Sequence, residues 1–314
     1  MNKQRPPSLK LESLHRWYCQ CSAFLLMVIM IGLIGALLML AYPSIRHFGF
    51  HFFVSGAWNP VTQDFGAVNV ILGTLITAVL AVLITVPASF FTAIFIVRLL
   101  PPTVSTWFSR LIELMAAIPS IIYGIWGLFA FGPFLAGRVY PFLIGLFASV
   151  PVLNRVVTGL PIATTLLTAS VILSFMIYPL ITSMMRDVIG SIPPNLTEAA
   201  YSVGLTRWQM VRSIYVHYTR SGLLGSVVLG LGRALGETMA VTFVIGNAHG
   251  DFQGLLMPGS TIASSIANEF TEATSALYQS ALVELALILL LISFITLFVS
   301  RYILSHQNTR GGTQ

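Results

Sequence analysis

Two charged side chains interrupt an otherwise apolar stretch of this chain. Arg233 and Glu237 lie within residues 221–247. A charged residue at mid-membrane costs several kcal/mol, so it normally faces the bundle interior and serves a function. The guanidinium fork can bind two oxygens of an anion at once, and a carboxylate beside it can accept a hydrogen bond from a protonated oxygen. At a spacing of four residues, we expect both side chains on one helix face.

The surroundings of this pair are rich in glycine. Gly230, Gly232 and Gly236 flank the two charges, and small residues let another helix or a ligand approach the backbone closely. A structural alternative is that Glu237 merely neutralises Arg233, which is common for buried charges. Both roles stay open from the residues alone, and the cost of a charge in the membrane favours the functional one.

The elements that position the pair are membrane helices. Charged residues make up only 8% of the 314 residues, and the mean hydropathy is +0.87. A soluble domain carries about 25% charged residues, so the composition predicts a protein that crosses the membrane several times. The net charge of +6 then mainly reports orientation, and nucleic-acid binding is a poor interpretation.

Apolar runs divide the chain. The first is longer than the apolar core of about 7–15 residues in a cleavable signal sequence, so we expect it to remain as a helix. We predict an all-α protein with six spans, at residues 21–42, 66–97, 111–131, 161–184, 221–247 and 278–304. The shorter run at 139–153 is expected outside the bilayer core or dipping into one face, because another crossing would put two basic segments on opposite sides.

The basic residues set the expected orientation. Twelve of the 16 Lys and Arg residues fall in the N-terminal segment, the loops at 98–110 and 185–220, and the C-terminal tail. The positive-inside rule places these parts in the cytoplasm. The chain is therefore expected to consist of a cytoplasmic N-terminal segment (1–21), a transmembrane domain (22–304) and a cytoplasmic tail (305–314).

The loop at 185–220 has the pattern of two short helices. A first helix is expected after Pro193-Pro194, and Gly204 interrupts it. Thr206 is a suitable N-cap for a second helix, with Gln209 completing a capping box. This polar helix runs straight into the apolar span. The loop is suited to fit a groove on a soluble partner, or it is a connector that packs on its own bundle; the residues leave both open.

The same loop resembles the EAA motif of ABC-importer permeases. The resemblance consists of Glu198-Ala199-Ala200, Gly204 and Ile214 at the spacing of that motif. In the family, this motif docks on the ATPase subunit, which implies an ATPase-coupling role for Glu198, Ala199, Ala200 and Gly204. The chain departs from the motif at one place, since Val216-His217 stand where the motif usually ends in Leu-Pro.

Three further stretches resemble the PstC-type permeases of phosphate-specific ABC importers. These stretches are Pro119–Gly124 (PSIIYG), Arg233–Val241 (RALGETMAV) and Thr261–Phe270 (TIASSIANEF). The resemblance implies the type I ABC importer permease (MetI-like) fold in a bacterial inner membrane. It also implies a PstA-type permease partner, two ATPase subunits that bind ATP and Mg, and an extracytoplasmic phosphate-binding protein. No cofactor is then expected in this chain, and membrane lipid is its other partner.

The resemblance also assigns Arg233 and Glu237 to the phosphate path. A carboxylate beside the anion would accept a hydrogen bond from protonated phosphate and repel fully ionised sulfate. A permease for another oxyanion such as sulfate or molybdate is one alternative, against which the RALGETMAV stretch argues. A stand-alone secondary transporter or channel is another, but it needs no docking loop, and no convincing internal repeat is found. A membrane sensor would need an output domain or partner.

Other polar residues fit structural roles better. Glu113 and Glu284 are expected near span ends, as interfacial or capping residues. Arg138 and Arg155 could meet an anion-carrying binding protein or anchor the 139–153 segment to headgroups. His249 lacks partner ligands for a metal, and Cys19 and Cys21 are unlikely to bridge. The chain has no phosphate-binding loop for ATP and no catalytic Ser-His-Asp or Cys-His arrangement, so an enzyme is the weakest class.

Overall fold

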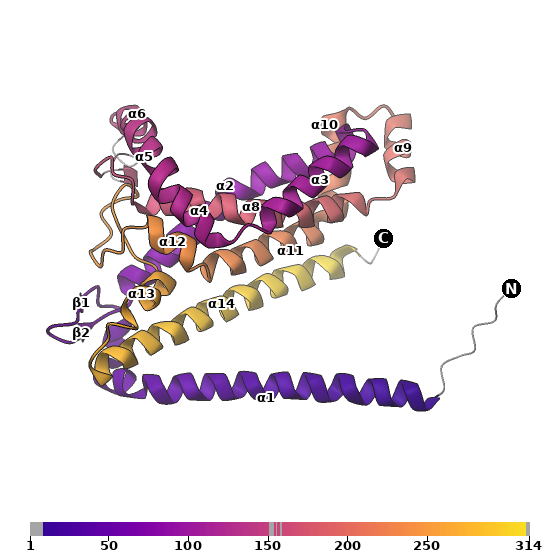
Figure 1. Ribbon diagram of the computed structural model, residues 1–314. Coiled ribbons are helices and arrows are strands. Elements are labelled where there is room, and N and C mark those ends of the chain that lie inside the picture. Colours follow the sequence, from indigo (N-terminus) through magenta and orange to yellow (C-terminus); the bar gives the residue numbers. More distant parts are fainter. Residues whose placement is uncertain (1–8, 151–153, 155, 158, 312–314) are drawn as a thin grey trace.

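The computed structural model shows helices joined by short irregular segments (Figure 1). It describes residues 9–150, 154, 156–157 and 159–311. Within these residues, five helical segments are long and apolar enough to cross a membrane: His15–Phe53, Val68–Leu99, Ser120–Phe147, Leu166–Gly190 and Ala276–Tyr302. The predicted all-α membrane architecture is confirmed. Arg155 and parts of the predicted terminal segments lie outside the described residues.

The two end helices form one side of the molecule. Helices α1 (Leu9–Phe48) and α14 (Ala276–Gly311) contact each other near the end of α1 and diverge from there (Figure 1). The backbone N–H of Ser44 donates to Ser280 Oγ at 2.9 Å, a polar contact between them. None of the most apolar window of α1 is buried within the chain. This helix therefore offers a long apolar surface to lipid or to another membrane protein.

The core is built by α2 (Val68–Ile94), α8 (Leu166–Gly190) and α11 (Val216–Leu235). Hydroxyl groups join α2 to α8 in the apolar interior. Thr85 donates to the carbonyl of Ser174 at 3.0 Å, and Thr182 donates to Ser89 Oγ at 2.9 Å. Membrane helices gain little from apolar burial alone, so close packing and such bonds hold them together.

The third span differs from the prediction. Helix α3 (Pro102–Ala116) ends before Pro119, whose ψ of 138° is not helical, and a new helix begins at Ser120. From there the chain stays helical to Phe147, through α4 (Ser120–Trp126), α5 (Gly132–Phe134) and α6 (Tyr140–Phe147). The predicted limits 111–131 are therefore wrong, because residues 139–147, which were expected as a separate short segment, continue the same helix.

Proline explains the error. Pro133 and Pro141 suggested interruptions, yet π-helical turns at Gly127–Phe131 and Leu135–Val139 come directly before them. A wider turn leaves room for the proline ring beside the preceding carbonyl groups. The helix therefore continues although proline donates no hydrogen bond. Four crossings still separate the start of the chain from the 185–220 loop, which preserves the parity used in the prediction.

The fifth predicted span is broken. Helix α11 ends at Leu235, residues 236–238 are not helical, and α12 (Met239–Val244) follows. Neither piece belongs to the five apolar segments found in the described part of the chain. Five of the six predicted spans thus have counterparts, and the sixth consists of two helices that meet near Arg233 and Glu237.

The two ends of the bundle carry different loops (Figure 1). On one side of the picture, α9 (Pro194–Ser202) and α10 (Arg207–Met210) lie at the same end of the molecule as the start of α1 and the end of α14. At the opposite end lie the hairpin of β1 (Trp58–Asn59) with β2 (Asp64–Phe65), and α13 (Ile262–Glu269). The segment 245–261 connects α12 to α13 and pairs with the start of α8, where Leu166 N–H donates to the carbonyl of Met257 at 3.1 Å.

Gly73 on α2 allows a test of how closely α2 packs against the 245–261 segment. A Cβ on Gly73 would lie 2.0 Å from the backbone oxygen of Ser260, whereas a Cβ on Gly35 of α1 would meet nothing within 4 Å. Because a backbone atom cannot swing aside, Gly73→Ala should lower the free energy of unfolding by about 1–3 kcal/mol. Thermal unfolding of the purified protein measures this, with Gly35→Ala as the matched control. Equal stability of the two variants would contradict the packing.

Candidate functional site

Arg233 and Glu237 lie on either side of the break between α11 and α12. Arg233 is in the last turn of α11, and Glu237 follows its end. Glu237 Oε1 accepts a hydrogen bond from the backbone N–H of Ala240 at 3.2 Å, so the carboxylate caps the first turn of α12. The expectation that both side chains share one face of a continuous helix is therefore wrong, because the helix ends between them.

Arg233 is exposed at the surface of the bundle. Within the described residues it makes no hydrogen bond or ion pair, and the ion pairs found there involve Arg186 and His249. The structural alternative, a buried Arg233–Glu237 pair, is not what the structure contains. The guanidinium keeps its hydrogen-bond donors available while its helix is packed among apolar elements.

A pocket of about 160 Å³ lies beside Arg233. Its walls come from the junction of α3 and α4, from α8, and from α11, with Met115, Tyr123, Leu180 and Arg233 among the lining residues. Glu237 does not line it. The arrangement can hold a small anion against the guanidinium.

The other carboxylates have definite places. Glu113 on α3 forms an ion pair with Arg186 on α8 at 3.1 Å, which joins these two helices. Glu284 lies on α14, eight residues after its first residue, and is buried within the chain with 3% of its surface exposed. Arg138 is exposed in a π-helical turn.

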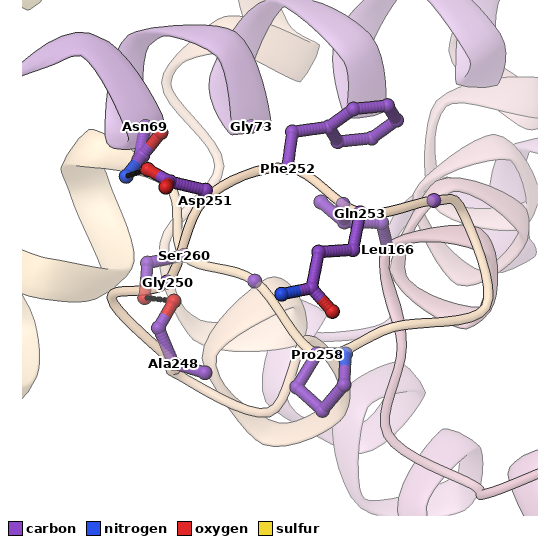
Figure 2. A pocket seen from close by; sticks show the side chains of 12 residues that line it. Asn69, Gly73, Leu166, Ala248, Gly250, Asp251, Phe252, Gln253, Pro258 and Ser260 are labelled. Carbon is purple, nitrogen blue, oxygen red and sulfur yellow. Dashed lines mark hydrogen bonds between the residues drawn. The ribbon is translucent and has the colours of Figure 1, made fainter. Parts of the chain in front are cut away.

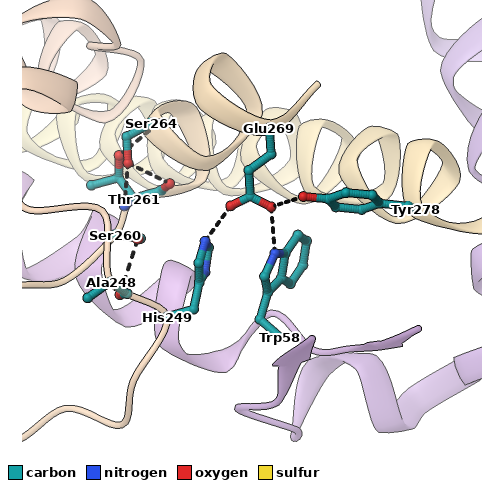
Figure 3. A network of polar contacts seen from close by, with 8 residues as sticks. All are labelled: Trp58, Ala248, His249, Ser260, Thr261, Ser264, Glu269 and Tyr278. Atoms are coloured by element: carbon teal, nitrogen blue, oxygen red, sulfur yellow. Dashed lines mark hydrogen bonds and ion pairs between the residues drawn. The ribbon is translucent and has the colours of Figure 1, made fainter. Parts of the chain in front are cut away.

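At the end opposite α9 and α10, three side chains from three segments meet at Glu269 of α13 (Figure 3). Trp58 Nε1 donates to Glu269 Oε2 at 2.7 Å, the Tyr278 hydroxyl donates to the same oxygen, and His249 bonds to Oε1. The rings of Trp58 and His249 are stacked, with centroids 5.2 Å apart. We call Trp58, His249, Glu269 and Tyr278 the Glu269 cluster.

This cluster was not predicted from the sequence. His249 was considered alone because its partner is 20 residues away in the chain and lies on another element. The conspicuous stretch 261–270, which ends beside Glu269, was the available signal. Among the described residues no group of three possible metal ligands is found. Through its hydrogen bonds to Glu269, the cluster joins the β-hairpin, the 245–261 segment and the start of α14.

The protonation of Glu269 follows from its partners. Burial by itself would raise the pKa of this carboxyl, but the hydrogen bonds from His249, Tyr278 and Trp58 and the charge of His249 outweigh burial. The pKa of Glu269 is consequently lower than its ordinary value of 4.5. The carboxylate is ionised at neutral pH.

A narrow pocket lies between α2 and the 245–261 segment (Figure 2). Its volume is about 20 Å³, which is room for about one water molecule. Asn69 Nδ2 donates to Asp251 Oδ1 at 3.2 Å across its edge, and Ser260 donates to the carbonyl of Ala248 at 3.2 Å. The first contact holds the segment on α2, and the second joins two parts of the segment itself.

The predicted helix pair at 185–220 is present. Glu198 and Ala199 of α9 are exposed, while Ala200 is buried against the core. Gly204 has φ +80°, a conformation that favours glycine. The capping box at Thr206 is confirmed: Gln209 N–H donates to Thr206 Oγ1, and Thr206 N–H donates to Gln209 Oε1 at 2.8 Å.

The second helix of the pair is continuous with the membrane helix. After α10, a π-helical turn at Val211–Tyr215 leads directly into α11. Since His217 rather than proline follows Val216, nothing forces the helix to end there. Arg98 is in the π-helical turn Phe95–Leu99 that follows α2; it lies over the ring of Tyr215, 5.0 Å from its centroid, and donates to the carbonyl of Ile189 at 3.1 Å. The helix pair is thus attached to α2 and α8.

Comparison with known proteins identifies the relatives of this chain. Residues 85–306 match the family described as "Binding-protein-dependent transport system inner membrane component". The chain is 47% identical to the phosphate transport system permease protein PstC of Mesorhizobium japonicum, over 93% of this chain and 90% of the relative. It is 45% identical to the PstC protein of Haemophilus influenzae, over 96% of each chain.

Solved structures show the same fold at low sequence identity. A bacterial alginate ABC transporter, in complex with a periplasmic protein that has bound an alginate pentasaccharide, has a chain with TM-score 0.58 and 18% identity, covering 93% of this chain and 96% of its own. The inward-facing MetNI methionine ABC transporter has one with TM-score 0.51 and 16% identity, covering 82% and 97%. At these identities the likeness concerns the fold, which is that of ABC-importer permeases.

The Glu269 cluster makes a prediction about acid stability. The carboxylate is stabilised in the folded state, so its contribution is fully present above the ordinary pKa of 4.5 and is lost as the pH falls through the lower folded value. Glu269→Gln should reduce the free energy of unfolding by about 2 kcal/mol at neutral pH. Thermal unfolding between pH 7 and acid measures the difference, which should shrink below the ordinary pKa.

The control is Glu272→Gln, because Glu272 is an exposed carboxyl that lies three residues further along the chain than Glu269. It should leave stability unchanged at each pH. A Glu269→Gln difference that stays constant down to acid pH would mean that the ionised carboxylate does not hold the three segments together.

Proposed function

Because this chain belongs to the family of binding-protein-dependent transport system inner membrane components, we propose that it is the PstC-type permease subunit of an ATP-driven importer of inorganic phosphate. Relatives with up to 47% identity across more than nine-tenths of the chain are named phosphate permeases, which supports this substrate over another oxyanion. The permease fold and the α9–α10 pair also disfavour a stand-alone secondary transporter.

The position of Arg233 is the observation that carries the proposal. An exposed guanidinium near the middle of an apolar bundle cannot be left in hydrocarbon, because its desolvation costs several kcal/mol. The surface around it must therefore border a hydrated path or another subunit. A homologous PstA-type permease that covers this surface would complete such a path, with Arg233 facing the anion.

In this proposal Glu237 links the position of α12 to anion binding. Its carboxylate bonds to the N–H of Ala240, which fixes the direction of α12 relative to α11. When that bond opens, the carboxylate is available to accept a hydrogen bond from protonated phosphate, whereas ionised sulfate would be repelled. Alternating access would then change both the helix break and the availability of this acceptor.

The energy is supplied by separate subunits in this proposal. Two ATPase subunits, which bind ATP and Mg, dock on the α9–α10 pair of this chain and on its counterpart. The exposed Glu198 and Ala199 and the exposed Trp208 at the N-terminal turn of α10 offer a contact surface. A phosphate-binding protein docks at the opposite end. The start of α1, the end of α14 and the α9–α10 pair are then cytoplasmic, in the bacterial inner membrane, as the basic residues indicate.

Arg233 and Glu237 make the first prediction of this proposal. Arg233→Gln removes the charge that binds the anion and should lower radiolabelled phosphate uptake by about 100-fold or more, consistent with the loss of charge-assisted hydrogen bonds. Glu237→Gln keeps an oxygen that caps α12 but loses the charge, and should also abolish uptake. Uptake is measured in cells without their own high-affinity system, with sulfate as competitor.

The matched control is Arg110→Gln, an exposed arginine that lies over the ring of Trp107 on α3. It should transport normally, and all three variants should assemble with the partner subunits. Normal phosphate uptake by an assembled Arg233→Gln or Glu237→Gln variant would remove that residue from the path. If the assembled complex with the unaltered chain transported no phosphate, that would contradict the substrate.

Gly204 makes the second prediction. An alanine at φ +80° costs about 1–2 kcal/mol, and open space around the position leaves strain as the sole effect. Gly204→Ala should change the angle between α9 and α10 and lower the phosphate transported per ATP hydrolysed. Gly190→Ala, which also has open space and no positive φ, is the control. An unchanged ratio in reconstituted complexes would argue against coupling through this turn.

A further inference from the structure

The pocket beside Arg233 contains a second side chain that can donate a hydrogen bond. Of the residues lining it, only Arg233 and Tyr123 have strong side-chain donors; the others include Ile118, Met176 and Leu180. Its volume of about 160 Å³ is several times the roughly 10–15 Å³ that a single water needs on the same measure. A tetrahedral oxyanion therefore fits together with part of its water shell.

The hydrogen bond of the Tyr123 hydroxyl costs little free energy to break. Its hydroxyl donates to the backbone carbonyl of Met115 at 3.1 Å, across the break between α3 and α4. The same carbonyl also accepts from the N–H of Ile118 at 3.3 Å. If the hydroxyl turns away, the carbonyl keeps one donor, so no buried polar group is left unsatisfied.

Glu237, the other charged residue near the helix break, cannot donate a hydrogen bond to an anion in this pocket. Glu237 lies outside the pocket lining, and its carboxylate is bonded to Ala240. A carboxylate would in any case repel an ionised oxygen. Arg233 alone leaves part of an anion without a partner, and the phenol is the neighbouring group that can hydrogen-bond it without changing the net charge of the pocket.

We propose that Tyr123 is a second anion-binding residue of the path, whose hydroxyl leaves the Met115 carbonyl and donates to the oxyanion held by Arg233. This inference rests on the proposed phosphate-import function and adds a second binding group to it. The junction of α3 and α4 then forms one wall of the path, and anion binding loosens the bond that connects these two helices.

The first arm of the test is Tyr123→Phe, which removes one hydroxyl and keeps the ring. The complete importer is reconstituted in vesicles with its binding protein and ATP. Loss of a hydrogen bond to a charged group should lower the phosphate transport rate by about tenfold or more. The control is Tyr178→Phe, because the Tyr178 hydroxyl donates to Thr92 Oγ1 at 2.8 Å, away from the pocket, and its loss should leave the rate unchanged.

The second arm separates anion binding from a purely structural role. Cys19 and Cys21 are replaced by serine, and Leu180→Cys introduces a reporter in the pocket wall. An anionic thiosulfonate reagent labels this cysteine, and inorganic phosphate should slow the labelling several-fold. The protection should be lost in Tyr123→Phe. Met176→Cys is a second reporter if the first variant does not assemble.

The outcomes are distinct. Slow transport together with lost protection supports the inference. Slow transport with protection retained would overturn it and assign Tyr123 only to holding α4 against α3. Normal transport in Tyr123→Phe would also overturn it, while leaving phosphate import intact. Absence of phosphate transport in the assembled complex with Tyr123 present would contradict the proposed function itself.

Discussion

A charge in the hydrocarbon region has to be satisfied by protein or water, and this constraint governs the centre of the molecule. At the break between α11 and α12, the backbone N–H of Ala240 is satisfied by Glu237, whereas the exposed Arg233 has no partner in the described part of the chain. A broken helix is tolerated at membrane depth only where protein or a water-filled cavity covers it. The isolated chain is therefore incomplete at this surface, and a second permease subunit is the natural cover.

The same helix connects this centre to the end that carries the α9–α10 pair. Because α10 continues through a π-helical turn into α11, a displacement of the pair moves the helix that ends beside Arg233. Arg98 ties the turn to α2 and α8, which limits how far the pair can move on its own. Beyond the break, α12 leads into the 245–261 segment, which is held at the opposite end by the Glu269 cluster. Spatial continuity of this kind is a route by which the two ends can be coupled.

The fold and the substrate of this protein are inferred from different observations. The alginate and methionine transporters share the architecture at 18% and 16% identity, so the bundle itself does not specify a substrate. Selectivity has to come from the few polar groups that the bundle exposes to its path. In the path that we propose, these are Arg233, Tyr123 in the same pocket and, once its bond to α12 opens, Glu237.

The sequence by itself determined the helical membrane architecture, the helix pair with its capping box at Thr206, and the two charges near residue 235, because hydropathy, capping and charge cost are local properties. Tertiary structure decided what depends on distant neighbours. π-helical turns carried a helix past Pro133 and Pro141. The break after Leu235 separated Arg233 from Glu237, and packing brought Tyr123 to the pocket of Arg233. His249 contacts Glu269 because the 245–261 segment folds back onto α13, and the spacing of residues in the sequence does not predict such a contact.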